Sequence, residues 1–450
     1  MKKSLFAVAA LTAIAGTAQA QSSVTVYGLL DMGYVGGNAR AVTANGTSTK
    51  TQVSQFGQSQ EQTSRLGFKG TEDLGGGASA FFTVEMGLTP QNPNIGGTTA
   101  NDKIQGTDQN GGSTLDNRQS FVGLKKNGIG QAAFGRQYTP IFNAGAATDA
   151  SQYANVLGNV IYNGSSIAGV DAQGGNYGSY NSAFTNRASN ALTFNSDKFA
   201  GFGVNGMYAM NNQNSTQFGS VVAGATAAQV TAASTFGGNV NWNGWGLSAD
   251  YTWQKLYLTV AYQSFKTQYA NPIVPATGLI NVGGTGQGGQ SISTATLFGA
   301  STLSDKQTYV GGTYDFGILK AYAQWVGRKV QQDNAASNSL SVTGAQLNRT
   351  AQQIGVRSYI TPTIEAWGSV GSGKYTGPVS TSAVTGGAAV GTLPASVNFI
   401  GWQLGSNYYL SKRTNLYAIY GQTQTSSGTS GTPGSGSSGN QYALGVRHTF

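Results

Sequence analysis

The sequence predicts an all-β protein, a single antiparallel β-barrel of sixteen strands that crosses a membrane. Three observations lead to this fold class. Apolar and polar residues alternate with period two in many segments, short and long connections alternate along the chain, and only 9% of the 450 residues are charged. An ordinary soluble domain has roughly 25% charged residues. The chain is therefore neither a typical cytosolic enzyme nor a charged disordered tail.

The first twenty residues have the parts of a secretory signal. Two lysines precede an apolar stretch, and small residues flank the expected cleavage site AQA (18–20). We expect residues 1–20 to be removed and residues 21–450 to form one barrel domain. The apolar stretch is shorter than the roughly 20 residues that a membrane-spanning helix needs.

Period-two alternation is clearest in the segments KLYLTVAYQ (255–263), ILKAYAQWVG (318–327) and QQIGVRSYI (352–360). Each places apolar residues on one face and polar residues on the other, which is typical of a half-buried strand. The same pattern predicts sixteen strands, at 24–35, 61–70, 78–88, 116–126, 129–138, 187–196, 201–211, 244–253, 255–266, 305–316, 317–329, 350–361, 363–374, 397–410, 413–426 and 440–450.

The connections supply the topology. Tight turns such as EDLGGG (72–77), KNG (126–128) and DFG (315–317) alternate with long polar stretches, among them 36–60, 139–186 and 267–304. An even strand number, with short periplasmic turns at one rim and long extracellular loops at the other, is the pattern of an outer-membrane barrel. A bilayer offers no water to backbone amides, so the sheet must close, and the first strand must pair with the last. A secreted soluble β-sandwich or β-solenoid is the alternative that alternation alone leaves open.

The composition excludes several classes of site. Cysteine is absent and the only histidine is His448. Disulfides, thiolate metal sites, Ser-His hydrolases and multi-histidine zinc sites are therefore not expected. We expect no enzyme activity, no cofactor and no metal. Despite the basic net charge, no arginine-rich helix or compact basic patch favours nucleic acid as a partner.

Several segments resemble a known family. The order of VTVYGLLDMGY, SRLGFKGTEDLGGG, NRQSFVGL, FGRQY and NRASNALTFNSDKFAGFGV, with GVRHTF at the end, is similar to the Gram-negative general diffusion porins, especially those of β-proteobacteria. The match runs from about residue 23 to 210 and again over the last strand. The resemblance implies a homotrimeric sixteen-stranded barrel in the outer membrane, with the third loop (139–186) folded into the lumen as a constriction.

The resemblance also implies site residues. In these porins arginines on the barrel wall face acidic groups on the third loop, and the matching arginines here are Arg65, Arg118 and Arg187. Asp149 matches a constriction acid when it is counted from FGRQY. We expect a secondary lumen lining, and a terminal signal that the barrel-assembly machinery reads. The lining residues are Lys69, Arg136 and Asp171, and the terminal signal consists of Val446, His448 and Phe450.

Three arginines facing one or two carboxylates predict a weakly to moderately anion-selective pore, because guanidinium groups stay charged and attract anions in a constriction of low dielectric constant. The expected function is passive diffusion of small hydrophilic solutes and ions through the outer membrane, in contact with its lipid. A channel specific for an anionic nutrient, with a saturable site, is the main alternative. A barrel enzyme would need a histidine near a nucleophile or an acid, and an adhesive barrel would use the long loops.

Overall fold

A computed structural model gives the fold. It describes residues 23–42, 48–90, 116–162, 184–215, 238–270, 280–282, 290–292, 301–334, 345–379, 393–428 and 437–450. Within these ranges most residues belong to a β-strand or to a short turn between strands. No helix in the described ranges is both long and apolar enough to cross a membrane.

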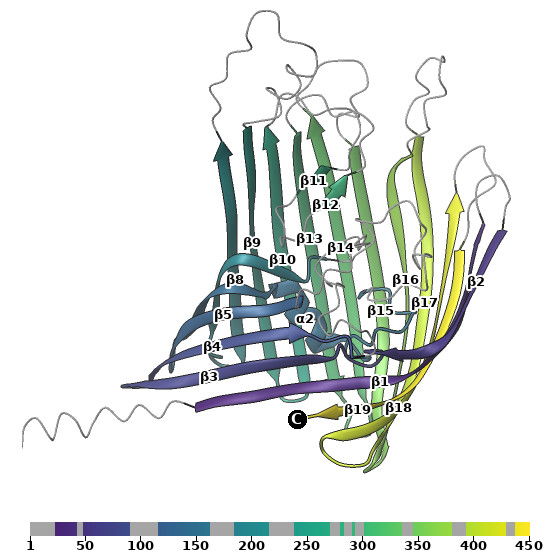
Figure 1. The fold of residues 1–450 in the computed structure, drawn as a ribbon, viewed down its shortest axis with the longest axis horizontal. Helices are drawn as coiled ribbons and strands as arrows, with labels where there is room; N and C mark the ends of the chain where they lie inside the picture. Colours follow the sequence, from purple (N-terminus) through teal and green to yellow (C-terminus); the bar gives the residue numbers. More distant parts are fainter. Residues whose placement is uncertain are drawn as a thin grey trace, which may run out of the picture.

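One sheet contains seventeen described strand segments, and it closes on itself into an antiparallel barrel (Figure 1). The segments are β1 (Ser23–Val42), β2 (Ser48–Gln58), β3 (Arg65–Gly75), β4 (Ala78–Gly87), β5 (Asp116–Lys126), β6 (Gly130–Tyr138), β7 (Arg187–Ser196), β8 (Phe202–Ser215), β9 (Gly238–Trp253), β10 (Leu256–Ala270), β13 (Ser301–Asp315), β14 (Lys320–Asn334), β15 (Ala345–Thr361), β16 (Ile364–Val379), β17 (Leu393–Tyr409), β18 (Thr414–Gly428) and β19 (Ser437–Thr449).

Two of these segments count as one strand of the barrel. The upper half of β1 pairs with β2, from Met32 opposite Gln58 onward, and its lower half pairs with β3, up to Leu29 opposite Arg65. β2 and β3 therefore continue one another across an irregular segment, 59–64. Counted this way, the barrel has sixteen strands and the predicted fold class is confirmed. The prediction of a loop over 36–60 was wrong, since β2 lies within it.

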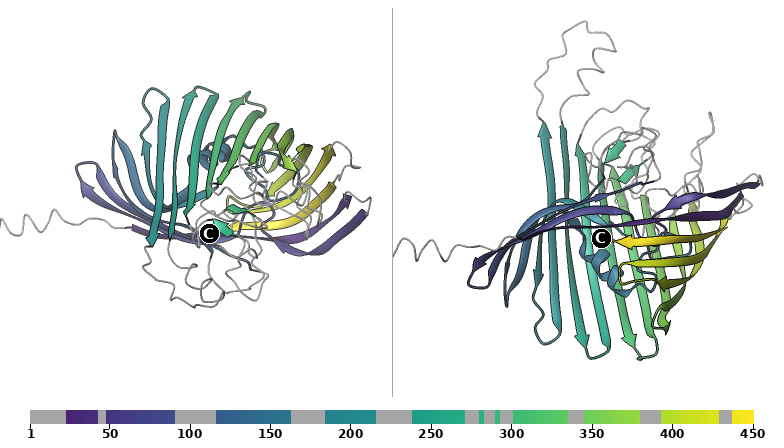
Figure 2. Two further views of the ribbon diagram at one scale, coloured as in Figure 1. Left: turned by 90° about the horizontal axis from the view of Figure 1, so that it is seen from above. Right: turned by 60° about the horizontal axis from the view of Figure 1, so that its bottom comes forward.

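The barrel closes between its first and last strands. β19 pairs with β1 in antiparallel register from Leu29 opposite Thr449 to Ala41 opposite Ser437. β1 and β3–β5 run strongly inclined to the upright strands β9, β10 and β13–β15 (Figure 1). The curved sheet encloses an interior space, in which helix α2 (Pro140–Thr148) lies (Figure 2).

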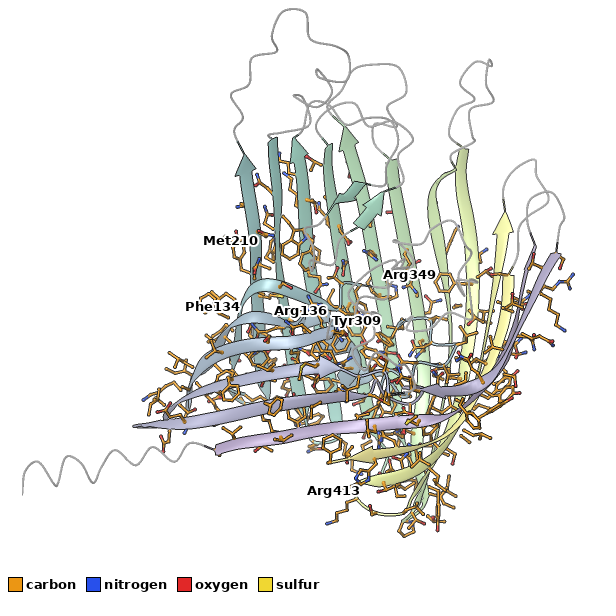
Figure 3. All side chains as sticks on the ribbon, viewed as in Figure 1. Phe134, Arg136, Met210, Tyr309, Arg349 and Arg413 are labelled. Carbon is orange, nitrogen blue, oxygen red and sulfur yellow. The ribbon has the colours of Figure 1, made fainter. Side chains whose placement is uncertain are left out.

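The two faces of the sheet differ in chemistry. On β10, Leu258 and Val260 are exposed on the outer face, whereas Gln263 is fully buried on the inner face. Phe134 and Met210 likewise lie on the outer side, and Arg136, Tyr309 and Arg349 lie toward the interior (Figure 3). Apolar side chains outside and polar side chains inside are the reverse of a soluble β-protein, and they match the face assignment that the alternation predicts.

Seven short connections of two to five residues join strands at one rim of the described barrel. Gly128, between β5 and β6, has φ of +81°, a backbone conformation that favours glycine. At the other rim, α2 lies between the fifth and sixth predicted strands, 129–138 and 187–196. The predicted loop 267–304 contains a two-stranded hairpin, β11 (Ile280–Val282) and β12 (Gln290–Ile292).

Candidate pore constriction

Arg65 and Arg118 lie on either side of one carboxylate on the inner wall. Arg118 Nε of β5 is 2.7 Å from Glu85 Oε1 of β4, and Arg65 Nε of β3 is 3.9 Å from Glu85 Oε2. Tyr27 of β1 donates a hydrogen bond of 3.1 Å to the same Oε2. Glu85 therefore balances part of the charge of both arginines.

Two β-bulges turn arginines toward the interior. The register of β4 and β5 shifts between Glu85 and Met86, opposite Arg118, and that of β6 and β7 shifts between Gly135 and Gln137, around Arg136. A bulge adds one residue to a strand, so two neighbouring side chains can share a face. Arg136 is held there by bonds from its guanidinium to Asn117 O (2.6 Å) and Ser189 Oγ (2.7 Å).

Tyr138 joins Arg118 to Arg187. Its hydroxyl accepts a hydrogen bond of 2.7 Å from Arg118 Nη2, and the Arg187 guanidinium lies 5.1 Å from the centre of its ring. Arg187 is only 1% exposed, and its Nε and Nη1 have no hydrogen-bond partner. Within the described residues these donors have no acceptor, and a buried donor without an acceptor is costly.

Arg65, Arg118, Arg136 and Arg187, together with Glu85, are named the arginine cluster below. Four guanidinium groups against one carboxylate give the described cluster a formal charge of +3. Lys69, on the same face of β3 as Arg65, is exposed and lies 5.3 Å from the ring centre of Tyr27. Asp171 lies outside the described residues.

The third loop begins with α2, which lies against the inner face of β8–β10, β13 and β14. Thr139 caps the helix by accepting from Phe142 N at 3.3 Å, and Pro140 occupies the first turn. Both residues are typical of a helix start. The chain then runs on as irregular backbone to residue 162.

Asp149 ends α2 and is 1% exposed. Its carboxylate accepts from Tyr153 N at 2.8 Å, from Asn159 Nδ2 at 3.1 Å and from Gln353 Nε2 of β15 at 3.0 Å. Burial raises the pKa of this carboxyl above its ordinary value. The structure thus brings Arg65, Arg118 and Arg187 together, while the hydrogen bonds of Asp149 hold the loop to the opposite wall.

Glutamines on the inner wall bind the backbone of this loop. Gln353 accepts from Val160 N at 3.0 Å, and Gln441 accepts from Leu157 N at 3.0 Å. In all, six glutamines on six different strands form hydrogen bonds with the loop backbone. They are Gln263 and Gln307 at Thr185, Gln324 at Gly145, Gln353 at Val160, Gln403 at Val156 and Gln441 at Leu157. Each of these bonds satisfies a backbone group that lies away from water.

Glycines on the same wall leave room for the loop. A Cβ atom at any of them would meet loop atoms: Pro140 for Gly246, Thr148 for Gly311, Ala150 for Gly355, Val160 for Gly371, Gly158 for Gly401 and Leu157 for Gly421. These six glycines and the six glutamines above are named the loop track. Without side chains at the glycines, the loop lies directly on the sheet.

The wall itself bends inward at segment 59–64, between β2 and β3. The buried Asp31 carboxylate accepts from the backbone N–H groups of Glu61 (2.8 Å) and Gln62 (2.7 Å). Asn155 of the loop donates from its backbone N to a carbonyl of this segment at 2.8 Å. The loop therefore spans the lumen from α2 to this bend.

The C-terminal residues lie on the outer face of β19. Val446, His448 and Phe450 are all exposed, and His448 Nδ1 is 2.9 Å from Thr414 Oγ1. Phe450 and Gly28 exchange two backbone hydrogen bonds of 3.1 Å.

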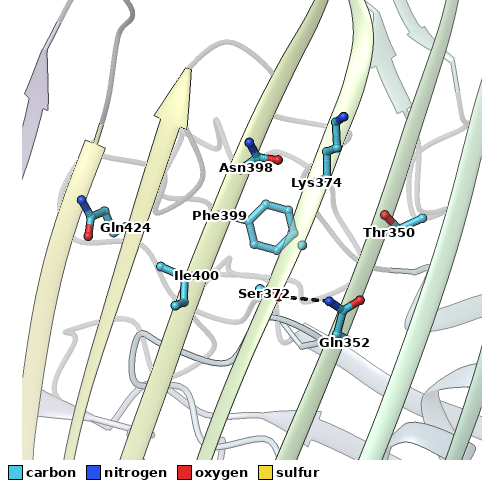
Figure 4. Close-up of a pocket in the computed structure, with 9 residues that line it drawn as sticks. Thr350, Gln352, Ser372, Lys374, Asn398, Phe399, Ile400 and Gln424 are labelled. Atoms are coloured by element: carbon cyan, nitrogen blue, oxygen red, sulfur yellow. Dashed lines mark hydrogen bonds between the residues drawn. The ribbon is translucent and has the colours of Figure 1, made fainter. Parts of the chain in front are cut away.

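A polar cavity of about 570 Å³ also lies on the outer face, across β15–β18 (Figure 4). Gln352 donates to Ser372 Oγ at 3.0 Å there, close to Lys374. These residues face away from the lumen, since their neighbours Arg349 and Gln353 are buried on the inner face. Gln352 therefore lies on the opposite face of β15 from Gln353 of the loop track.

Sequence reasoning missed Glu85, Tyr138 and the loop track. Glu85 lies opposite Gly67, two residues from Arg65, in a register that the structure gives and the sequence alone does not. Within the described part of the chain, no group of three or more Asp, Glu, His or Cys residues is arranged to hold a metal ion.

Comparison with known proteins places the chain in a family. The model of the Gram-negative porin family matches residues 7–428. The chain belongs to the Gram-negative porins. Among curated porins it is 38% identical to an outer membrane porin protein of Bordetella pertussis over 144 residues, which are 30% of this chain and 34% of that protein.

The chain is also 31% identical to the major outer membrane protein P.IB of Neisseria gonorrhoeae over 212 residues, 46% of this porin and 48% of the relative. It thus spans a third to a half of the length of these relatives. The fold of the anion-selective porin from Comamonas acidovorans superposes with a TM-score of 0.56 at 20% identity, over 95% of this chain and 100% of that one. This likeness shows the sixteen-stranded barrel fold.

Proposed function

We propose that the protein forms a water-filled channel in the outer membrane for the passive diffusion of small hydrophilic solutes and ions, with a preference for anions. Membership in the porin family and the closed barrel, apolar outside and polar inside, support a channel. Sixteen strands enclose a lumen too wide for wall side chains alone to fill. Cleavage of residues 1–20, a homotrimer and delivery by the barrel-assembly machinery belong to the same proposal.

The arginine cluster is the observation that carries the anion preference. Its formal charge is +3 among the described residues, and Arg187 has two N–H donors without acceptors. Guanidinium groups stay protonated, and a wall of low dielectric constant strengthens their attraction for an anion. A small anion that passes the cluster meets its excess positive charge.

The test is the reversal potential of the refolded protein in a planar bilayer under a KCl gradient. We expect chloride preference in the wild type and a smaller preference in Arg65→Ala and Arg118→Ala. Arg413→Ala is the matched control, because Arg413 is exposed in the turn between β17 and β18 (Figure 3). Its reversal potential should equal that of the wild type.

Cation preference, or an unchanged reversal potential in both cluster variants, would overturn the selectivity mechanism. Conductance that saturates with salt, instead of rising nearly linearly, would favour a channel with a specific anion site. Absence of conductance from folded protein would overturn the channel itself.

A further inference from the structure

A second cavity lies on the inner face, below α2 and bounded by β4–β9. Its volume is about 220 Å³. Six amide side chains line it together with the rings of Phe81 and Phe121, and four of these amides are Gln119, Gln131, Asn143 and Asn195. Its size suits one small solute.

The lining differs from the arginine cluster in charge. Apart from Tyr138, the residues that line the cavity carry no ionisable side chain. Moving a charged solute from water into such a place is unfavourable unless a countercharge is present. The lining itself therefore offers hydrogen-bonding groups and no charge, and the arginines that contact the lining residue Tyr138 are Arg118 and Arg187.

The amides are available for a ligand. Within the described ranges, the side chains of the four amides above make no hydrogen bond with the protein, in contrast to Gln137, which accepts from Thr193 at 2.7 Å, and Asn205, which donates to Ser248 at 3.1 Å. An amide presents two donors and an acceptor. Four of them around one cavity match a solute with several hydroxyl groups, each of which also donates and accepts.

The aromatic rings supply a complementary apolar surface. Phe81 and Phe121 meet edge to face with ring centres 6.2 Å apart, and Tyr138 stacks on Phe142 at 4.1 Å. These contacts fix the rings at the edge of the cavity. A few placed polar groups around aromatic rings are the usual composition of a small-molecule site. A sugar ring, with C–H groups on its faces and hydroxyls at its edge, fits both kinds of surface.

We propose that this cavity is a binding site for one neutral polyhydroxylated solute, such as a hexose. The inference rests on the proposed channel, because the solute reaches the cavity through the lumen. Tyr138 connects the two sites, since its hydroxyl bonds to Arg118 and its ring borders the cavity. A bound solute narrows the path beside the arginine cluster and reduces the ion current.

The experiment measures the chloride current of single channels in a planar bilayer while glucose is added, and then gluconate as an anion of the same carbon number. We expect glucose to block the current in a saturable way and gluconate to block it more weakly. Loss of one or two hydrogen bonds, or of a ring face, should weaken the block about tenfold in Gln119→Ala and in Phe121→Leu.

The matched controls are Gln352→Ala and Phe134→Leu, which change the same residue types on the outer face. Their glucose block should equal that of the wild type. Conductance without saturable glucose block, stronger block by gluconate, or equal weakening in the controls would each overturn the site. Failure to conduct at all would instead overturn the proposed channel, so the two failures are distinguishable.

Discussion

The two sides of the lumen wall differ in how many carboxylates are available to pair with their arginines. On the far wall, Arg328 bonds to both carboxylate oxygens of Asp305 at 3.0 and 2.6 Å, and Arg357 lies 3.2 Å from Glu365. The arginine cluster, in contrast, has Glu85 as its one carboxylate within the described residues. Among these ion pairs, the excess of arginines over carboxylates lies on the side of β3–β7.

Glu85 should set the strength of the anion preference. Glu85→Gln removes the negative charge and keeps an oxygen that accepts from Arg118, so the variant should fold and its reversal potential should shift further toward chloride. Reversal potentials under the same KCl gradient check this. Glu72→Gln, an exposed acid near the turn between β3 and β4, is the control. A shift of Glu85→Gln toward potassium would contradict the role of the cluster.

Sequence reasoning could place the arginines but not their acid partner. Arg65, Arg118 and Arg187 each occur in a family motif, whereas Glu85 stands in a run of apolar residues, FFTVEMG, whose pairing register the sequence does not give. The resemblance places the counter-acid on the third loop, where Asp149 lies. That residue is bound by Gln353 of the far wall, a contact between residues 204 positions apart.

The buried carboxyl of Asp149 should make loop docking dependent on pH. Because burial raises its pKa in the folded protein, its contribution to stability is present at low pH and is lost as the pH rises through the folded pKa. Wild type should therefore gain stability relative to Asp149→Asn as the pH falls from neutral toward about 4, the ordinary pKa of a carboxyl. Thermal unfolding of both proteins at several pH values checks this. A difference independent of pH would contradict it.

Among the elements, the third loop depends most on contacts that are distant in sequence. Its described part holds few regular hydrogen bonds of its own beyond the nine residues of α2. The glutamines of the loop track supply partners for its backbone, and the glycines let it approach the sheet. The loop is thus fixed by the wall, and the constriction that we propose for it should be rigid.

Filling one glycine of the loop track should displace the loop. A Cβ at Gly421 would overlap the backbone carbonyl of Leu157, which cannot rotate away as a side chain can. Gly421→Ala should cost about 1–3 kcal/mol of stability through overpacking and raise single-channel conductance. Gly368→Ala is the control, because its Cβ would come closest to the end of the Leu404 side chain, at 2.8 Å, and would meet the Gln403 carbonyl at 3.4 Å, an ordinary contact. Unchanged conductance in Gly421→Ala would show that the track does not hold the constriction.

Elements with period-two alternation could be predicted, and elements without it could not. β10 and β14 alternate clearly and lie within a few residues of their predicted bounds. β2 was missed because STKTQVSQFGQ is polar on both faces along most of its length and resembles a loop. α2 was missed because PIFNAGAAT is short and apolar without a helical period that stands out, and its position depends on the barrel wall.

At the scale of the whole molecule, closure of the barrel depends on one long strand pair. β1 and β19 pair over thirteen residues, and the terminal Phe450 adds two backbone hydrogen bonds with Gly28 at its end. The Phe450 ring lies over Gly28, where a Cβ would come within 2.6 Å of it. Phe450 thus extends the pairing of β1 and β19 through its backbone hydrogen bonds and through the contact of its ring with Gly28.

Changes at Phe450 should separate these two contributions. Phe450→Ala keeps the backbone bonds and loses the ring, whereas deletion of Phe450 loses both, at about 1 kcal/mol for each hydrogen bond. Loss of pairing between β1 and β19 leaves backbone amides without partners facing lipid. The unfolding temperature in detergent should therefore fall in the order wild type, Phe450→Ala, deletion. Phe199→Ala, which changes an exposed phenylalanine in the turn between β7 and β8, should melt like the wild type. Equal melting of the two Phe450 variants would assign the whole effect to the ring, and a deletion as stable as the wild type would show that closure is complete without the terminal residue.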